Sequence, residues 1–217
     1  IPNFTRELRD SLRTVYPYWA GAKGPSDTKV LSKFPVMEIR ASSLIENRFD
    51  PYCYTFYRID VKGRPLTLVN IHFTSYDLTD DERRVVTDVK NVDSAKESMR
   101  EMKGTIGSKM SEGFRKRKVD AENLCTALRK IDGPLILCGD FNDVPESYSY
   151  RLLRGEGLED AYAQTGFGPM ITYNKHLFWF HIDQILYRGA IRPLSVKKGS
   201  LKSSDHYPLT AEFEFRQ

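Results

Sequence analysis

The sequence predicts a single α/β or α+β domain with a large share of β-sheet. Alternating apolar and polar segments typical of strands recur along the 217 residues, and amphipathic helical segments lie between them. No linker, low-complexity stretch or internal repeat divides the chain. A chain of this length buries roughly 70% of its unfolded surface when it folds, so one hydrophobic core stabilises it without disulfides. We therefore expect one domain over residues 1–217.

Helical and strand patterns alternate in the first third of the chain. The segment from Phe4 to Tyr18 carries apolar residues at helical spacing and predicts an amphipathic helix. Thr28 to Ile39 is apolar on both sides of Pro35, which predicts two short strands around a bend. Tyr52 to Val61 and Leu66 to Thr74 alternate in polarity on either side of a turn, so we expect a β-hairpin.

The longest helical region runs from Asp80 to Arg129 and is rich in Lys, Glu and Met. Gly104, Gly107 and Gly113 interrupt it, so we expect at least two helices. Its second half contains the basic run Arg115 to Lys118. This run is either a solvated helix face or a basic contact for a phosphate-bearing substrate.

Three further strands are predicted, and polar residues follow the first of them. Pro134 to Cys138 is an apolar run that fits a buried strand, and the other two are Ile182 to Tyr187 and Pro208 to Phe215. Because side chains alternate along an extended chain, Asp140 and Asn142 point to the same side at the carboxyl end of the first strand. Ligands bind there in α/β sheets, although an ordinary Asp/Asn turn gives the same pattern.

Polar side chains also interrupt three other apolar segments. Asn70 and His72 share one face of a strand whose other face is apolar. Asp183 lies inside an apolar strand, where a buried carboxylate needs a partner, and a histidine is the natural one. Asp205 and His206 place an acid and a base in the loop before the last strand. Together these residues offer carboxylates, amides and imidazoles but no thiolate. Oxygen-rich sites of this kind favour Mg²⁺ or Mn²⁺ over zinc and indicate metal-assisted attack of water on phosphorus.

The composition excludes several classes of protein. Lys and Arg number 33 and Asp and Glu 29, and the net charge of +4 is far below the basic excess of a dedicated nucleic-acid binder. A hydrophobic share of 40% excludes a disordered or fibrous chain. No apolar run approaches the ~18 residues of a membrane span. The cellular location stays open, and we expect any anchor or export signal to precede Ile1 in a longer protein.

The three cysteines are Cys53, Cys125 and Cys138. They form no CxxC motif and no pairing with histidines. Cys125 falls in a helical pattern and Cys138 in an apolar run. Buried free thiols are therefore favoured over a zinc site or a disulfide.

The order of these segments resembles the endonuclease/exonuclease/phosphatase superfamily of DNase I-like proteins, which includes nucleases, inositol-polyphosphate phosphatases and neutral sphingomyelinases. The resemblance implies a four-layer α-β-β-α sandwich of two mixed sheets, with helices outside and a site at one end of the sheets. The matching blocks, in family order, are Leu31-Ser32-Lys33-Phe34-Pro35, Val69-Asn70-Ile71-His72-Phe73, Gly139-Asp140-Phe141-Asn142, Ile182-Asp183-Gln184-Ile185-Leu186 and Ser204-Asp205-His206.

The resemblance also implies roles for the residues near phosphorus and the metal. Asp140 would position and deprotonate the attacking water. Asn142 would hold a non-bridging phosphate oxygen near the metal. Asp205, together with Asp140, would be a ligand of Mg²⁺ or Mn²⁺.

Two histidines complete the implied site. His206, oriented by Asp183, would steady the negative charge that develops on the phosphoryl group. His72, supported by Asn70, would contact the scissile phosphate. Such groups aim donors and charge at the transition state, and each is typically worth about 3 kcal/mol.

The sequence departs from the family pattern at its start. Members begin with a strand that ends in Asn and continue to a strand that ends in a Gln-Glu pair, whose Glu is the principal metal ligand. Neither strand is present, and Glu7 and Glu46 lie in a helix and a loop that do not match it. We therefore expect an N-terminally truncated domain, about three-quarters complete, which on its own can lack activity.

The sequence patterns are compatible with three functions. A phosphodiesterase or phosphatase is favoured by the pair Asn70 and His72, whereas the basic run Arg115 to Lys118 keeps a DNase I-like nuclease open. The third is a non-catalytic binding or structural module that retains the fold. The substrate would be a phosphate ester of a small molecule, a lipid head group or a nucleic acid. Missing strands would also leave sheet edges exposed, which favours self-association.

Overall fold

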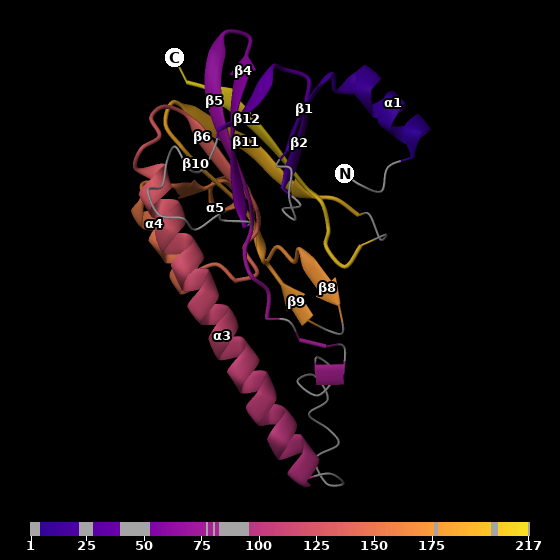
Figure 1. The fold of residues 1–217 in the computed structure, drawn as a ribbon. Coiled ribbons are helices and arrows are strands. Elements are labelled where there is room, and N and C mark those ends of the chain that lie inside the picture. The colour runs from indigo at the N-terminus through magenta and orange to yellow at the C-terminus, as the bar shows by residue number, and fades with distance from the viewer. Residues whose placement is uncertain are drawn as a thin grey trace.

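Helices and strands alternate along the chain, as Figure 1 shows. The computed structural model describes residues 5–21, 28–39, 53–76, 78–79, 81–82, 96–175, 178–200 and 204–216. The helices are α1 (Arg6–Val15), α3 (Lys96–Leu128), α4 (Tyr148–Gly155) and α5 (Ala161–Thr165). The strands are β1 (Tyr18–Gly21), β2 (Lys29–Ser32), β3 (Val36–Ile39), β4 (Tyr54–Val61), β5 (Arg64–His72), β6 (Leu135–Asp140), β7 (Glu159–Asp160), β8 (Tyr173–Lys175), β9 (Phe178–Phe180), β10 (Asp183–Arg188), β11 (Ile191–Lys198) and β12 (Leu209–Phe215).

A six-stranded mixed sheet forms the centre of the fold, with the strand order β3-β4-β5-β6-β10-β7. Strands β5 and β6 run parallel, and the other neighbours are antiparallel. A parallel pair needs a crossover connection, and α3 lies in this one. The carboxyl ends of β5 and β6 therefore meet at the same edge of the sheet.

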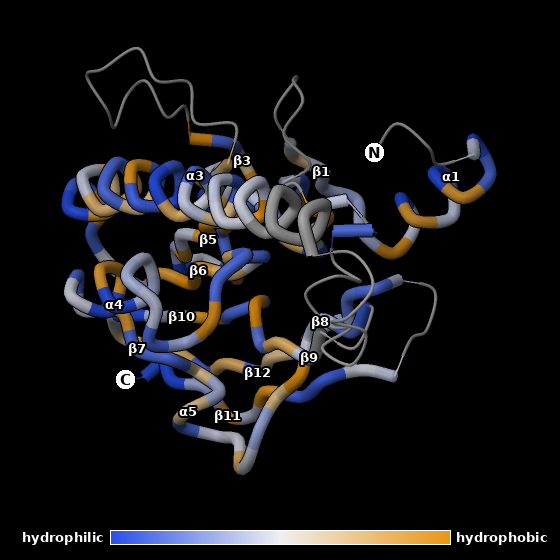
Figure 2. Tube along the Cα trace, turned by 90° about the horizontal axis from the view of Figure 1, so that it is seen from below, coloured by the Kyte–Doolittle hydropathy of each residue, from blue (hydrophilic) through white to orange (hydrophobic). Residues whose placement is uncertain are grey.

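Apolar side chains are buried on both faces of the central sheet. On one face, Leu137 packs in a cluster with Leu124 of α3 and Leu153 of α4. On the other face, Tyr187 packs in a cluster with Val196 of β11. Figure 2 shows the resulting layers, in which α3 lies on one side of the central sheet and β11, β12 and α5 lie on the other. The predicted α/β sandwich is confirmed.

The middle of the chain differs from the prediction. The region Asp80 to Arg129 was expected to contain at least two helices, but α3 runs without a break from Lys96 to Leu128, through Gly104, Gly107 and Gly113. Each helical glycine costs roughly 1 kcal/mol relative to alanine. Burial of the apolar face of α3 against the sheet outweighs that cost. The rest of that region lies outside the described residues.

Most of the predicted strands are present, and several elements were missed. The two strands around Pro35 are β2 and β3, and β4 and β5 form the expected antiparallel hairpin. The sequence patterns did not predict β1, β7, β8, β9, β11, α4 or α5. In β11 the reason is Pro193, which interrupts the strand pattern and lies at an irregularity of the register with β12.

The cysteines are free thiols. Cys125 is buried in α3, and Cys53 and Cys138 are half-buried. Burial raises the pKa of Cys138 to about 11, so this thiol stays protonated near neutral pH. Among the described helices, none is both long enough and apolar enough to cross a membrane.

Candidate active site

Three polar residues lie side by side where β5, β6 and β10 meet. Asp140 is the last residue of β6, and its register partners are His72 at the end of β5 and Asp183 at the start of β10. Parallel strands end at the same edge, whereas an antiparallel neighbour begins there. Partners in register point to the same side of a sheet, so the topology gathers these three side chains.

His206 comes from the loop before β12 and completes the cluster. Its Nδ1 lies 2.9 Å from Asp183 Oδ2, and its Nε2 lies 3.9 Å from Asp140 Oδ2. His72 Nε2 lies 3.8 Å from the same Asp140 oxygen. The ring of Tyr173 contacts His206 edge to face, with 5.0 Å between the ring centroids. The Asp140 carboxylate therefore lies near two imidazoles, and Asp183 and Tyr173 hold one of them in place.

The segment after β6 fixes the Asp140 carboxylate. The backbone N–H of Asn142 donates to Oδ1 at 2.7 Å, and its side-chain Nδ2 donates to Oδ2 at 3.0 Å and to the Phe73 carbonyl at 2.9 Å. Asn142 has a φ of 48°, a left-handed conformation that Asn tolerates. Gly139 has a φ of 140°, and a Cβ there would lie 1.9 Å from the carbonyl oxygen of Ile71. Gly139 thus lets β6 approach β5 closely. The left-handed conformation of Asn142 turns the chain after β6, so that Asn142 can hydrogen-bond to the Asp140 carboxylate.

The charges of the cluster shift two pKa values upward. Burial, and then the charge of Asp183, raises the pKa of Asp140 to about 6. The hydrogen bond that His206 donates to the Asp183 carboxylate raises the pKa of His206 above its ordinary value, against the effect of burial. Near neutral pH the site therefore favours an ionised Asp140 and a protonated His206.

The same cluster can hold a metal ion. Asp140, Asp183 and His206 each offer one ligand atom, and these atoms lie within 4.8 Å of one another. Burial, and after it the charge of Asp183, disfavours the ionised form of Asp140, and a bound cation would offset both effects. Carboxylate oxygens suit a hard divalent cation, so the donor set fits the metal that the resemblance implies.

The cluster opens into a cavity of about 770 Å³, a size typical of sites for small molecules. Both polar and apolar side chains line the cavity. The charged and polar ones include His72, Asp140, Asn142, Asp143, Glu146, Lys175, Asp205 and His206, and the apolar ones include Tyr76, Leu78, Met110, Phe114, Val144, Pro145 and Phe180.

Two of the residues selected from the sequence lie apart from the cluster. Asp205 lines the cavity, but its side chain is exposed and is not among the three clustered ligand groups. Asn70 does not line the cavity, and its Nδ2 donates to the Lys29 carbonyl at 3.4 Å. Asn70 therefore connects β5 to β2. The structure records no hydrogen bond between Asn70 and His72, so the support of His72 by Asn70 stays a prediction.

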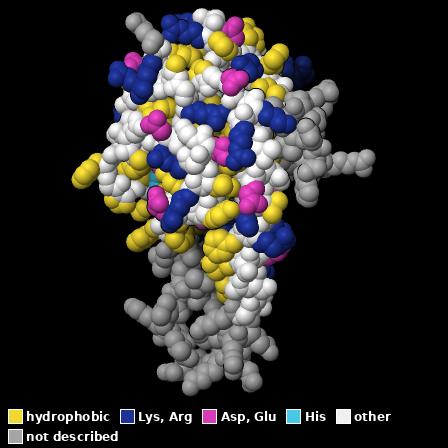
Figure 3. Space-filling view, turned by 90° about the vertical axis from the view of Figure 1, so that its left-hand side faces the viewer, with side chains coloured by type: hydrophobic (Ala, Val, Ile, Leu, Met, Phe, Trp, Pro, Cys, Tyr) yellow, Lys and Arg dark blue, Asp and Glu magenta, His cyan; other side chains and the backbone are white. Residues whose placement is uncertain are grey.

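The basic run of α3 is mostly a solvated face. Arg115 and Lys116 pair with Glu112, and Lys118 pairs with Glu122. Figure 3 shows Lys and Arg interspersed with Asp and Glu on the face that α3 and α4 form. Of the two interpretations of this run, the solvated helix face fits these three cations.

Arg117 is the exception, and no sequence pattern indicates its position. Its side chain is 1% exposed, and Nη1 donates to the Thr74 carbonyl at 2.9 Å. Nε lies 3.5 Å from Asp143 Oδ2, and the guanidinium carbon lies 4.2 Å from the Tyr76 ring centroid. Arg117 thus connects α3 to the segment after β5 and to the segment after β6. These segments directly follow His72 and Asn142.

The fold and the site together define an α/β sandwich protein with an acid–imidazole cluster at the strand ends. A model of the endonuclease/exonuclease/phosphatase family matches residues 3–206. The chain belongs to this family, whose fold supports hydrolysis of phosphoesters as the kind of function. No functionally curated protein matches the sequence.

Solved structures share the fold at low sequence identity. An endonuclease/exonuclease/phosphatase from Bacteroides vulgatus is 15% identical with a TM-score of 0.58, covering 97% of this chain and 81% of that one. A beta toxin from Staphylococcus aureus is 13% identical with a TM-score of 0.55, covering 95% and 81%. A humanized TDP2 from D. rerio is 14% identical with a TM-score of 0.57, covering 97% and 82%. This chain spans only about half the length of two other similar structures: 55% of one from Enterococcus faecalis and 53% of one from Leptotrichia buccalis.

Proposed function

We propose that the cluster around Asp140 is the active site of a Mg²⁺-dependent hydrolase that cleaves phosphoester bonds, as a phosphodiesterase or a phosphatase. The observation that carries the proposal is the Asp140 carboxylate, which lies near His72 and His206 beside the cavity. This arrangement offers a proton acceptor and positive charge, and hydrolysis of an anionic ester requires both. Membership of the family supports the same chemistry.

In this proposal Asp140 accepts a proton from the attacking water. A pKa of about 6 leaves the carboxylate ionised at neutral pH and makes it more basic than an ordinary aspartate. The two hydrogen bonds from Asn142 fix the direction of the carboxylate. Both amide hydrogens of Asn142 have acceptors, so binding of a phosphate oxygen by this amide would displace one of them.

His206 is the proposed source of positive charge. Asp183 holds His206 through Nδ1, which leaves Nε2 on the side of Asp140. The raised pKa of His206 favours its imidazolium form, which would stabilise negative charge on the phosphoryl group. His72, whose Nε2 lies 3.8 Å from Asp140 Oδ2, is proposed to contact the scissile phosphate.

We assign the divalent cation to the carboxylates of this site. Asp140 and Asp205 are its proposed ligands, and the Asp183 carboxylate lies close enough to Asp140 to be a further donor. When bound, Mg²⁺ or Mn²⁺ supplies Lewis acidity toward the phosphoryl oxygens. Removal of the cation is therefore expected to abolish turnover.

The apolar lining of the cavity supports a substrate with an apolar or aromatic substituent on the phosphate. Met110 and Phe114 of α3 and Phe180 of β9 contribute apolar surface, and Lys175 is the lysine that also lines the cavity. The paired cations of α3 also give little support to a nucleic-acid groove. A lipid phosphodiester or a small aromatic ester fits these features better than a polynucleotide.

The test is hydrolysis of bis-p-nitrophenyl phosphate by the full-length protein and by residues 1–217, measured side by side. We expect release of p-nitrophenol that EDTA abolishes and Mg²⁺ restores. A panel of sphingomyelin, inositol phosphates and supercoiled plasmid then identifies the substrate, and turnover of the plasmid alone would establish the nuclease alternative. Absence of hydrolysis by the full-length protein with Mg²⁺ would contradict the proposal and favour the non-catalytic module.

A further inference from the structure

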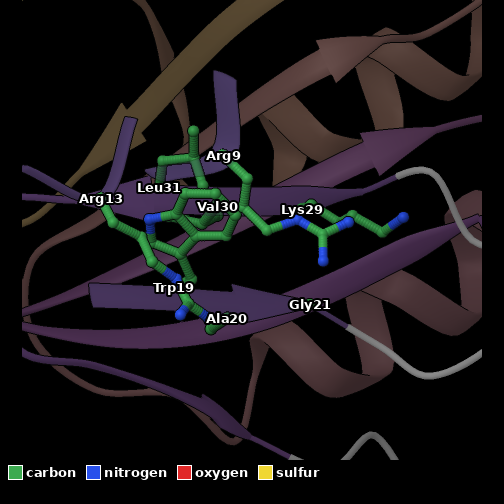
Figure 4. Close-up of a pocket in the computed structure, with 8 residues that line it drawn as sticks. All are labelled: Arg9, Arg13, Trp19, Ala20, Gly21, Lys29, Val30 and Leu31. Atoms are coloured by element: carbon green, nitrogen blue, oxygen red, sulfur yellow. The ribbon is translucent and has the colours of Figure 1, made fainter. Parts of the chain in front are cut away.

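A second cavity lies between α1 and the β1–β2 hairpin, and Figure 4 shows its side chains. Its volume is about 310 Å³, and it shares no lining residue with the catalytic cavity. Three of its lining residues are the cations Arg9, Arg13 and Lys29, and the other side chains around it are apolar. None of its lining residues carries a carboxylate.

The local structure explains why the three cations line one cavity. Arg9 and Arg13 are four residues apart in α1, so they lie on the same face of the helix. Lys29 is the register partner of Gly21 across the β1–β2 pair. A Cβ on Gly21 would lie 2.6 Å from Lys29 Cγ, so the glycine leaves the space over which the Lys29 side chain passes.

The positive charge of this cavity is not balanced within the described part of the chain. None of the three cations forms an ion pair with a described carboxylate. On α3, in contrast, neighbouring cations such as Arg115 and Lys118 are paired with glutamates. Three like charges around one hollow repel each other, and a bound anion would relieve that repulsion.

Trp19 adds a flat apolar surface beside the charges. Its indole N–H donates to the Tyr16 carbonyl, which fixes the ring. The guanidinium carbon of Arg13 lies 5.3 Å from the centre of the indole. This cation–π contact holds Arg13 at the cavity. Val30, which also lines the cavity, is buried and adds to its apolar side.

We propose that this cavity binds the phosphate group of a small organic phosphate, at a site separate from the catalytic cluster. Arg9, Arg13 and Lys29 hold the phosphate, because guanidinium and ammonium groups form strong charge-assisted hydrogen bonds with its oxygens. The apolar part of the ligand packs against Trp19. The inference does not depend on hydrolysis at Asp140.

Tryptophan fluorescence tests this site selectively, because the chain has only two tryptophans. In a Trp179→Phe background, all emission comes from Trp19. Titration with inorganic phosphate and with phenyl phosphate, at constant ionic strength, is expected to give a saturable change, with phenyl phosphate binding more tightly. In Arg9→Gln/Lys29→Gln, the loss of two charge-assisted contacts is expected to raise Kd about tenfold or more.

Two further variants keep the test specific. Arg115→Gln/Lys118→Gln removes an equal charge from two exposed, paired cations and is expected to leave Kd unchanged. Gly21→Ala retains every charge but displaces Lys29, so it is expected to weaken binding. Circular dichroism confirms that each variant is folded. A titration without saturation, equal affinity for the two phosphates, or an unchanged Kd in Arg9→Gln/Lys29→Gln would overturn the proposal.

Discussion

Replacement of Arg117 by methionine would test how α3 is connected to the active site. The substitution keeps an unbranched side chain of similar length but removes a buried cation that is 1% exposed. It deletes the hydrogen bond from Nη1 to the Thr74 carbonyl and the ion pair with Asp143. Both partners lie in segments that follow strands of the site.

The expected loss of stability can be estimated from these contacts. The Asp143 side chain is 8% exposed. Without Arg117 its carboxylate still accepts hydrogen bonds from the Ser149 hydroxyl at 3.0 Å and from the Val144 backbone N–H at 3.2 Å, but it loses its cationic partner. Removal of one partner of a buried ion pair costs about 3–5 kcal/mol. This is a large part of the ~5–15 kcal/mol that stabilises a typical domain. At about 2–4 °C per kcal/mol for a domain of this size, Tm falls by roughly 6–20 °C.

Urea unfolding followed by circular dichroism measures this loss. We expect Arg117→Met to lower the unfolding midpoint with an unchanged m value, which indicates a change of stability alone. Arg115→Met is the matched control, because Arg115 is exposed and lies two residues away on the same helix. Arg117→Met/Asp143→Asn should recover part of the loss, since it removes the unpaired carboxylate as well. Equal midpoints for Arg117→Met and Arg115→Met would refute the reasoning.

Three other predictions follow from the cluster. Gly139→Ala is expected to lower Tm strongly, because its Cβ would lie 1.9 Å from a backbone oxygen of β5; a thermal melt like that of the wild type would contradict this. Asp183→Asn should lower the pKa of both His206 and Asp140, because it removes the charge that favours the imidazolium and disfavours the second carboxylate; NMR titration of the metal-free protein measures both. Each raised pKa means that the folded state binds protons more tightly than the unfolded state. The free energy of unfolding should therefore fall as pH rises from 3.8 to about 6 through Asp140, and fall again above 6.5 through His206. Urea unfolding across this pH range checks the sign, and a rise in stability would contradict it.

The main elements of the site could be predicted because each residue interrupts a strand pattern. Asp140 and His72 stand at the end of apolar segments and Asp183 lies within one, and alternation along a strand predicts which side they face. Their register, with His72 and Asp183 both opposite Asp140, is a property of the strand order. The sequence does not contain that order, so distances within the cluster could not be predicted from it.

Buried charge was the main feature that could not be predicted. Charged residues are almost never fully buried unless they are paired, so a run of four cations on a helix favours exposure. Three of them are exposed as expected, whereas Arg117 is buried and pairs with Asp143, which lies 26 positions later in the chain. Helical spacing identifies neighbours within α3, but it contains no information about partners on other elements. The glycines of α3 were misjudged for the same reason, because packing against the sheet outweighs their helix propensity.

The adjacent pair Asp205 and His206 shows a related limit. The two residues are neighbours in sequence, and the resemblance implied related roles for both. In the structure His206 joins Asp140 and Asp183, whereas Asp205 is exposed at the cavity. Consecutive residues of an extended segment point in opposite directions, so adjacency alone does not place two side chains in one cluster.

The central claim is that Asp140 is the proton acceptor of a hydrolytic site. The most direct test is kcat for bis-p-nitrophenyl phosphate in the full-length protein, comparing Asp140→Asn with Asp132→Asn, an exposed aspartate in the turn before β6. We expect Asp140→Asn to lower kcat by about 100-fold or more while the protein remains folded, which is the usual effect of losing a general base. The control Asp132→Asn should retain the wild-type kcat. Full activity of Asp140→Asn would contradict the proposed role of this cluster.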